Sequence, residues 1–284
     1  MELIRRAADL TAAVEARRSS GADVGLVPTM GALHDGHASL IRRARAERSV
    51  VVVSIFVNPR QFAPGEDLSR YPRDEARDVA LTEALGADLV WAPSEGEFYP
   101  QGVELPAPDP GPIGDVWEGA ARPGHFAGVL TAVHRLFDVV RPSAAYFGEK
   151  DAQQLFLVRR MVEGLGQPIE IVGCPTIREH DGLALSSRNA YLSPEEREQA
   201  GCLFLALSEA AELARAGERD PAAVVAAMAR EVGATALASL DYAAVVDEAT
   251  FEPPAEIDRP VRALIAARFP SARLIDNLRL PAAG

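Results

Sequence analysis

Short apolar runs alternate with amphipathic segments over the first 176 residues of the chain. The run at residues 50–57 is apolar on both faces and rich in β-branched residues, which is typical of a central parallel strand covered by helices on each side. Shorter runs predict further strands at residues 24–27, 87–91, 144–147 and 168–172. Apolar residues spaced three to four apart predict helices at residues 1–20, 38–46, 73–85 and 127–140. This alternation predicts an α/β fold with a doubly wound parallel sheet.

The pattern changes from about residue 177 onward. Residues 193–196, Ser-Pro-Glu-Glu, are the cap and first-turn residues expected at the start of a long helix, and Asp220-Pro221 begins another. Strands are then predicted at residues 240–246, 261–269 and 272–277. Helices followed by adjacent strands indicate a smaller α+β domain. We therefore expect a Rossmann-like domain at residues 1–176 and a second domain at residues 177–284.

The composition is that of a globular protein without a membrane segment. Its 284 residues suffice for one large domain or two ordinary ones, and 48% of them are hydrophobic and 25% charged. No apolar run approaches about 18 residues, so no membrane span is expected. The N-terminus has the pattern of an amphipathic helix rather than of a signal peptide, and cytoplasmic residence is the default expectation.

The net charge of −12 argues against a general nucleic-acid-binding protein, which would carry a basic face. This charge does not exclude ATP, but the positive charge facing its phosphates must then come from a few local residues and helix termini. The two cysteines, Cys174 and Cys202, lie among apolar residues and are expected to be buried. We predict neither a disulfide nor thiol chemistry.

The most informative segment follows the strand at residues 24–27, which we expect Pro28 to end. A glycine-bearing turn leads into a helix there, and such a turn offers unpaired backbone N–H groups and the positive end of a helix dipole to phosphate. His34 and His37 lie on one side of the first helical turn, and Gly36 leaves room for a flat ligand. We favour phosphate binding. Two structural histidines, or a zinc site that draws on the three other histidines of the chain, are the alternatives.

Residues that follow other strands are also candidates, because ligands of a doubly wound sheet bind beyond the carboxyl ends of its strands. Asn58 and Gln61 follow the central strand, and Lys150 follows the strand at residues 144–147. A capping box formed by Asp151 and Gln154 would explain this second segment without any ligand. However, a lysine beside a helix N-terminus is electrostatically unfavourable unless an anion shares the site. We therefore assign Lys150 to phosphate and Gln154 to a polar substrate.

A polar loop at the start of the second domain has two interpretations. Ser186, Ser187 and Arg188 lie in a segment with little periodicity, and hydroxyls followed by an arginine can hydrogen-bond phosphate. A solvated surface turn explains the same residues equally well.

Taken together, these segments resemble one protein family. The turn from His34 to His37 resembles the His-x-Gly-His signature of the nucleotidylyltransferase superfamily, and the whole set is similar to the pantoate–β-alanine ligase (pantothenate synthetase) family. The matching segments occur in the family's order at residues 28–37, 56–62, 66–68, 71–73, 125–129, 147–154 and 178–189. Leu185 departs from the family, which usually has Met there, but this exchange is nearly isosteric.

The resemblance implies an AMP-forming carbon–nitrogen ligase that condenses (R)-pantoate with β-alanine through a pantoyl-adenylate, giving pantothenate, AMP and pyrophosphate. Negative charge that develops on the phosphates then needs fixed donors and cations. The implied catalytic residues are His34, His37, Lys150 and Arg188. The implied ATP-binding residues are Met30, Gly31, Ala32, Leu33, His34, Asp35, Gly36, His37, Gly148, Glu149, Lys150, Asp151, Ile177, Leu185, Ser186, Ser187 and Arg188. Gln61 and Gln154 are implied to bind pantoate, and Gln61 also β-alanine.

The resemblance further implies Mg²⁺ on the ATP phosphates rather than in a protein site, a homodimer, and a C-terminal domain that closes as a lid. Two alternatives stay open. Another nucleotidylyltransferase of the superfamily would need more cations around its acceptor than the neutral Gln61 and Gln154 supply. A non-catalytic nucleotide-binding module has no evident need for both Lys150 and the Ser-Ser-Arg loop.

Overall fold

The computed structural model describes residues 1–282, which form two compact units. The first unit contains Met1–Glu149 and Gln153–Pro175, and the second contains Lys150–Ala152 and the chain from Thr176 onward. Unlike a single boundary between residues 176 and 177, this division assigns the short segment at Lys150 to the second unit. No helix among residues 1–282 combines the length and the apolar character needed to cross a bilayer.

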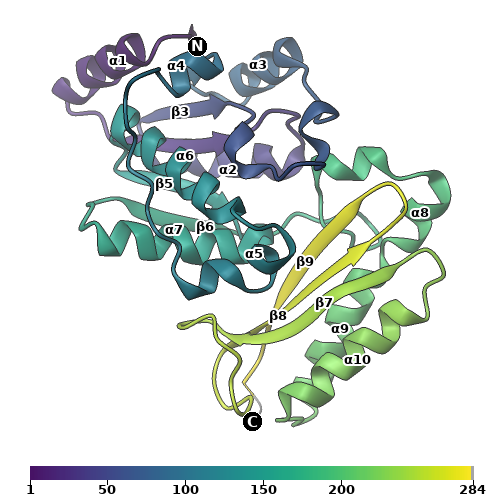
Figure 1. Ribbon diagram of the computed structural model, residues 1–284. Helices are drawn as coiled ribbons and strands as arrows, with labels where there is room; N and C mark the ends of the chain where they lie inside the picture. The colour runs from purple at the N-terminus through teal and green to yellow at the C-terminus, as the bar shows by residue number, and fades with distance from the viewer. Residues whose placement is uncertain (283–284) are drawn as a thin grey trace. The chain divides into compact units, whose positions relative to one another are not determined.

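The first unit, which contains β3, β5 and β6 in Figure 1, is built on a six-stranded sheet. The strand order is β1-β4-β3-β2-β5-β6, and neighbouring strands are parallel. The α/β class and the parallel sheet are thus confirmed. The strands are β1 (Glu2–Ile4), β2 (Val24–Thr29), β3 (Val50–Ile55), β4 (Leu89–Trp91), β5 (Ala144–Gly148) and β6 (Glu170–Cys174). The helices are α1 (Ala7–Ser19), α2 (Asp35–Glu47), α3 (Glu75–Ala84), α4 (Glu95–Phe98), α5 (Glu118–Ala121), α6 (His125–Val140) and α7 (Ala152–Gly164). Short 3₁₀ helices are η1 (Pro59–Gln61), η2 (Asp67–Ser69), η3 (Pro112–Asp115) and η4 (Glu149–Asp151).

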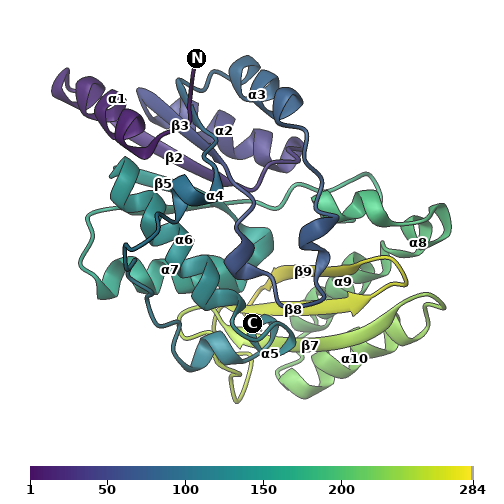
Figure 2. The same ribbon diagram turned by 45° about the horizontal axis from the view of Figure 1, so that its top comes forward.

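The order of the strands defines where a ligand is expected. The chain runs from β2 through α2 to β3 in one direction along the sheet, and from β5 through α7 to β6 in the other. Right-handed connections therefore place helices on both faces: α2 and α3 pack together on one, and α1 and α6 pack together on the other (Figure 2). The reversal lies between β2 and β5, and the carboxyl ends of strands at such a point are the usual ligand site.

Strand β2 does not end at Pro28, as the sequence suggested, but continues to Thr29. Pro28 lies opposite Ser54 of β3, whereas the ladder between β2 and β5 covers only Gly25 and Leu26. At Pro28 the strand has already passed the part that pairs with β5. A proline, which lacks an N–H, is tolerated at such a position.

The prediction of a helix from residue 1 is also wrong. Glu2–Ile4 form β1, which pairs in parallel with β4, and α1 begins at Ala7. Three residues are too few for hydrophobic periodicity to distinguish a strand from a helix. The parallel pairing with β4 therefore determines that Glu2–Ile4 form a strand.

The second unit is a three-stranded antiparallel sheet with helices, in agreement with the predicted α+β class. Its elements are η5 (Ser187–Tyr191), α8 (Pro194–Gln199), α9 (Cys202–Arg215), α10 (Pro221–Gly233), β7 (Ser239–Asp247), β8 (Val261–Arg268) and β9 (Arg273–Leu280). The single long helix predicted from Ser193 is instead α8 and α9, with a break at Ala200 and Gly201. At the break, the N–H groups of Leu203 and Phe204 donate to carbonyls three residues earlier, as in a tighter 3₁₀ turn.

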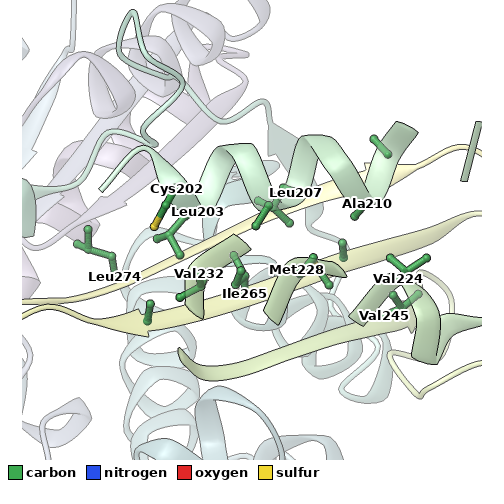
Figure 3. Packing of buried hydrophobic residues seen from close by; sticks show 14 of the residues in the cluster. Cys202, Leu203, Leu207, Ala210, Val224, Met228, Val232, Val245, Ile265 and Leu274 are labelled. Atoms are coloured by element: carbon green, nitrogen blue, oxygen red, sulfur yellow. The ribbon is translucent and has the colours of Figure 1, made fainter. Parts of the chain in front are cut away.

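The core of the second unit is formed by α9, α10 and the sheet (Figure 3). Leu203 and Leu207 of α9 are four residues apart, as are Val224 and Met228 of α10, so each helix has an apolar face. Ile265 of β8 belongs to the same buried cluster. This packing gives the strands of the second unit a fixed support.

Candidate active site

The turn that follows β2 is anchored by a buried carboxylate. Gly31 and Ala32 have φ angles of +80° and +50°, in the left-handed region. The N–H groups of Ala32 and Leu33 donate to Oδ2 and Oδ1 of Asp78 on α3, each at 2.8 Å, and Asp78 is 1% exposed. A Cβ at position 31 would lie 2.9 Å from Asp78 Oδ2, so glycine is required there by space as well as by φ. These two N–H groups hold the turn in place.

His34 and His37 form a reciprocal cap at the start of α2. His34 Nδ1 accepts a hydrogen bond from the Gly36 N–H at 3.1 Å, and His37 Nδ1 accepts one from the His34 N–H at 3.4 Å. The two ring centroids are 4.2 Å apart. Because Nδ1 accepts in both rings, the proton of each neutral imidazole lies on Nε2. Both rings can therefore donate from Nε2 beside the N-terminus of α2.

Gln61 lies just beyond β3, in η1, and two neighbours orient its amide group. Asn58 Nδ2 donates to Gln61 Oε1 at 3.1 Å, and Gln61 Nε2 donates to Met30 Sδ at 2.9 Å. Asn58 is 2% exposed and accepts a hydrogen bond from the Tyr99 hydroxyl at 2.7 Å. The contact with Met30 places Gln61 beside the turn that follows β2.

The backbone carbonyl of Gln61 is held by a cluster that the sequence did not reveal. His125 Nδ1 donates to this carbonyl at 2.8 Å and Arg122 Nη2 at 3.2 Å. Arg122 also pairs with Glu66 at 2.7 Å and donates to His125 Nε2 at 3.0 Å. Burial and the charge of Arg122 lower the pKa of His125 to about 4, so this ring is neutral at pH 7. A neutral ring is what the contact with Arg122 requires, because only an unprotonated Nε2 can accept.

The segment after β5 passes directly from a 3₁₀ helix into an α-helix. Glu149–Asp151 form η4 and α7 begins at Ala152, so Asp151 directly precedes α7 and Gln154 is its third residue. Gln154 is half-buried on the first turn of α7. Its neighbour Gln153 is buried and donates to the carbonyl of Ile113 at 2.6 Å, which gives Gln153 a structural role.

Lys150 belongs to the second unit, although we expected it in the first domain. Its side chain is 19% exposed, with Nζ 3.9 Å from Oδ1 of Asp151. Its backbone carbonyl accepts a hydrogen bond from Asn277 Nδ2 on β9 at 2.8 Å. Lys150 belongs to the second unit because of this tertiary contact, although it follows β5 of the first unit in the sequence.

The loop that carries Ser186 and Arg188 is an ordered turn of the second unit. The Ile177 carbonyl accepts from the Leu185 N–H at 2.9 Å, and Ser186 Oγ accepts from the Arg188 N–H at 3.2 Å as the cap of η5. Arg197 of α8 donates to the two acidic residues of the loop, Asp181 at 3.1 Å and Glu179 at 2.6 Å. The loop backbone is therefore held by hydrogen bonds, which are compatible with both interpretations of Ser186, Ser187 and Arg188.

The predicted residues are thus distributed over two units. In the first unit, Met30, His34, His37 and Gln61 lie together at the carboxyl ends of β2 and β3. Gly148 and Glu149 end β5 and begin η4 in the same unit. The first unit also contains Gly31, Ala32, Leu33, Asp35, Gly36 and Gln154, whereas the second unit contains Lys150, Asp151, Ile177, Leu185, Ser186, Ser187 and Arg188.

Sequence reasoning missed Asp78 and Asn277 because each acts on backbone groups, which leave no residue-specific pattern. The position of Asp78 on the buried face of α3, four residues before the buried Thr82, is the one signal that could have indicated it. Within residues 1–282, no group of three or more His, Cys, Asp or Glu side chains is placed to hold a metal ion.

The cysteines are both buried, as predicted, and burial raises the pKa of the Cys174 and Cys202 thiols. A raised thiol pKa disfavours the thiolate, which is the nucleophilic form.

Residues 2–279 match the family model described as pantoate-beta-alanine ligase. A pantothenate synthetase of Rhizorhabdus wittichii is 52% identical over 278 residues, covering 98% of each chain. The crystal structure of pantothenate synthetase from Thermus thermophilus has a TM-score of 0.93 at 50% identity, covering 99% of this chain and 100% of that one. A Francisella tularensis pantoate-beta-alanine ligase complexed with beta-gamma ATP and beta-alanine has a TM-score of 0.79 at 32% identity, covering 98% and 97%. The chain belongs to the pantoate–β-alanine ligase family.

Proposed function

We propose that this protein condenses (R)-pantoate with β-alanine to pantothenate, with ATP as the second substrate and AMP and pyrophosphate as products. The observation that carries the proposal is the family match over residues 2–279. The Francisella relative, complexed with beta-gamma ATP and beta-alanine, supports ATP and β-alanine as substrates. Pantoate follows from the family's reaction.

The reaction is proposed to proceed in two steps because a carboxylate is a poor electrophile. The pantoate carboxylate attacks the α-phosphorus of ATP, and the bond to the pyrophosphate leaving group breaks. The β-alanine amine then attacks the acyl carbon of the pantoyl-adenylate, forms the amide and releases AMP. Negative charge develops on phosphate oxygens in the first step, which is where fixed donors lower the barrier most.

The candidate residues supply donors of two kinds. His34 and His37 donate from Nε2, whereas Lys150 and Arg188 contribute positive charge. Mg²⁺ is proposed to bind the phosphate oxygens, its usual partners, and to neutralise part of their charge. The ATP contacts are proposed at residues 30–37, 148–151, 177 and 185–188.

Pantoate is proposed to lie against Gln61 and Gln154, whose amide groups can serve both its hydroxyls and its carboxylate. Gln61 is also proposed to face β-alanine. The amide orientation supports this assignment, because Asn58 holds Oε1 and the His125 cluster holds the backbone carbonyl. A residue whose conformation is fixed in this way can orient a small substrate without a large loss of side-chain entropy.

Three further parts of the proposal concern the whole molecule. The second domain, residues 177–284, is proposed to act as a lid over the Rossmann-like ATP- and pantoate-binding domain, residues 1–176, since closure would keep water from the adenylate. The protein is proposed to be a homodimer, which sedimentation velocity would test. It is proposed to reside in the cytoplasm, where all three substrates would be available.

The two-step reaction is tested by exchange of labelled pyrophosphate into ATP. With pantoate present and β-alanine absent, exchange is expected, because adenylate formation does not require the amine. AMP release, in contrast, should require all three substrates. Exchange that strictly depends on β-alanine would contradict a free-standing adenylate, and exchange without pantoate would contradict pantoate as the acceptor of the adenylyl group.

A further inference from the structure

Asn277 links Lys150 to the sheet of the second unit. Its Nδ2 donates to the Lys150 carbonyl at 2.8 Å, and Asn277 is 4% exposed. Its Oδ1 accepts from Arg262 of β8, which is 7% exposed and pairs with Glu248 at 2.8 Å. The Asn277 side chain therefore bridges the backbone of Lys150 and a buried guanidinium.

The orientation of this amide is fixed by its two partners. A flip of the Asn277 side chain would direct its NH₂ at the Arg262 guanidinium and its oxygen at the Lys150 carbonyl. Both contacts would then join like groups, two donors in one case and two acceptors in the other. Because the group is buried, water cannot compensate for either mismatch.

Asp276, the residue before Asn277, holds the loop that leads to Arg188. Asp276 accepts two hydrogen bonds from the guanidinium of Arg178, one of them at 3.0 Å, and its side chain is 2% exposed. Arg178 also donates to the Gly182 carbonyl at 2.9 Å, within the loop that leads to Arg188. Adjacent residues of β9 thus anchor both the Lys150 segment and the Arg188 loop.

We propose that Asn277 is a positioning residue for Lys150, because it holds the backbone from which the Lys150 ammonium extends. The inference rests on the proposed function, in which Lys150 faces the ATP phosphates. A lysine side chain is long and flexible, so its ammonium can be placed only if its backbone is held. Displacement of a catalytic group by about 1 Å can cost roughly 100-fold in rate.

The test is a double-mutant cycle on single-turnover adenylate formation from ATP and pantoate, in the full-length protein. Asn277→Ala is expected to slow this step by about 10- to 100-fold. In a Lys150→Ala background, the same substitution should slow it by less than about 3-fold, because no ammonium is left to position. If the two effects multiply instead, Asn277 acts independently of Lys150 and the inference is overturned.

Two controls separate the possible failures. Arg279→Ala removes an exposed partner of Glu248 on the same strand and leaves both side-chain contacts of Asn277 in place, so it should keep the wild-type rate. Asn277→Asp keeps the acceptor for Arg262 but removes the donor for Lys150, so it carries the cycle if Asn277→Ala does not fold. A Lys150→Ala variant with the wild-type rate would contradict the proposed phosphate role of Lys150 itself, whereas a slow Lys150→Ala with multiplicative Asn277 effects would contradict only the positioning role.

Discussion

Replacement of Asp78 tests whether a buried carboxylate fixes the turn between β2 and α2. Its two oxygens each accept one backbone N–H, from Ala32 and Leu33, at 2.8 Å. Asp78→Ala removes the acceptor of a buried N–H, that of Leu33, and of a part-buried one, that of Ala32, so we expect the free energy of unfolding to fall by about 2–4 kcal/mol. Asp78→Asn keeps one acceptor oxygen and turns an NH₂ toward the other N–H, so we expect a loss of about 1–3 kcal/mol.

Urea unfolding followed by tryptophan fluorescence measures the change in the free energy of unfolding of the first unit. Both tryptophans, Trp91 and Trp117, belong to the first unit, so the signal reports the unit that contains Asp78. Asp74→Asn is the matched control, because Asp74 caps the same helix through a single N–H contact at 3.1 Å and asparagine is an equally good cap. Its effect should stay within about 0.5 kcal/mol.

Activity gives a second measure of the same turn. A turn that relaxes should displace the His34 and His37 rings, which follow it directly, so pyrophosphate exchange should fall in Asp78→Asn even where the protein is fully folded. An Asp78→Asn variant that matches Asp74→Asn in both stability and exchange would refute the anchoring role of Asp78.

Three further predictions concern other parts of the chain. Arg188→Ala should slow adenylate formation by roughly 30- to 1000-fold while weakening ATP binding far less, because the contact of Arg188 with the phosphates is expected mainly in the transition state. Single-turnover adenylation and equilibrium ATP binding measure the two effects. Equal losses in both would make Arg188 an ordinary ground-state ligand. Gly182→Ala should destabilise the second unit by about 2–4 kcal/mol in calorimetry, because φ is +90° and the new Cβ would lie 1.9 Å from Phe204 Cδ1. Gly217→Ala, with φ +92° and open space around it, should cost only about 1 kcal/mol, and equal costs would exclude a steric role for Phe204. The pKa of His125 is about 4 in the folded chain, against 6.5 for an unperturbed histidine, so the unfolded chain binds more protons between these two pH values. The free energy of unfolding should therefore fall by about 3 kcal/mol as the pH is lowered from 6.5 to 4. His125→Gln should remove this part of the pH dependence, as measured by urea unfolding at several pH values.

The strands of the sheet and the helices that cover it were predictable because buried apolar residues recur along each element with the period of a strand or of a helix. The run at residues 50–57 lies between β2 and β4, and its apolar residues on both faces follow from that central place. The same reasoning failed at Pro28, because whether a missing N–H matters depends on which neighbouring strand is still paired. It failed at β1 because three residues carry no period.

The candidate site was predictable where the side chain itself carries the chemistry. His34, His37, Gln61 and Lys150 were singled out by their position after strands and by the chemistry of their side chains. Asp78 and Asn277 were not, because their partners are a pair of amides and a carbonyl that any residue could supply. Contacts of this kind depend on the tertiary fold, and the sequence shows them only as a polar residue in a buried place.

The proposed imidazole and amide donors and the proposed cations of the site belong to different units. In the first unit the donors that we propose for ligands are the Nε2 groups of His34 and His37 and the amide of Gln61. The cations, Lys150 and Arg188, belong to the second unit, where β9 holds both segments. In a chain with a net charge of −12, positive potential toward phosphate must be local, and the two cations that we propose to supply it both belong to the second unit. Substitutions in the second unit should therefore affect adenylate formation most, whereas substitutions at Gln61 should affect pantoate recognition first.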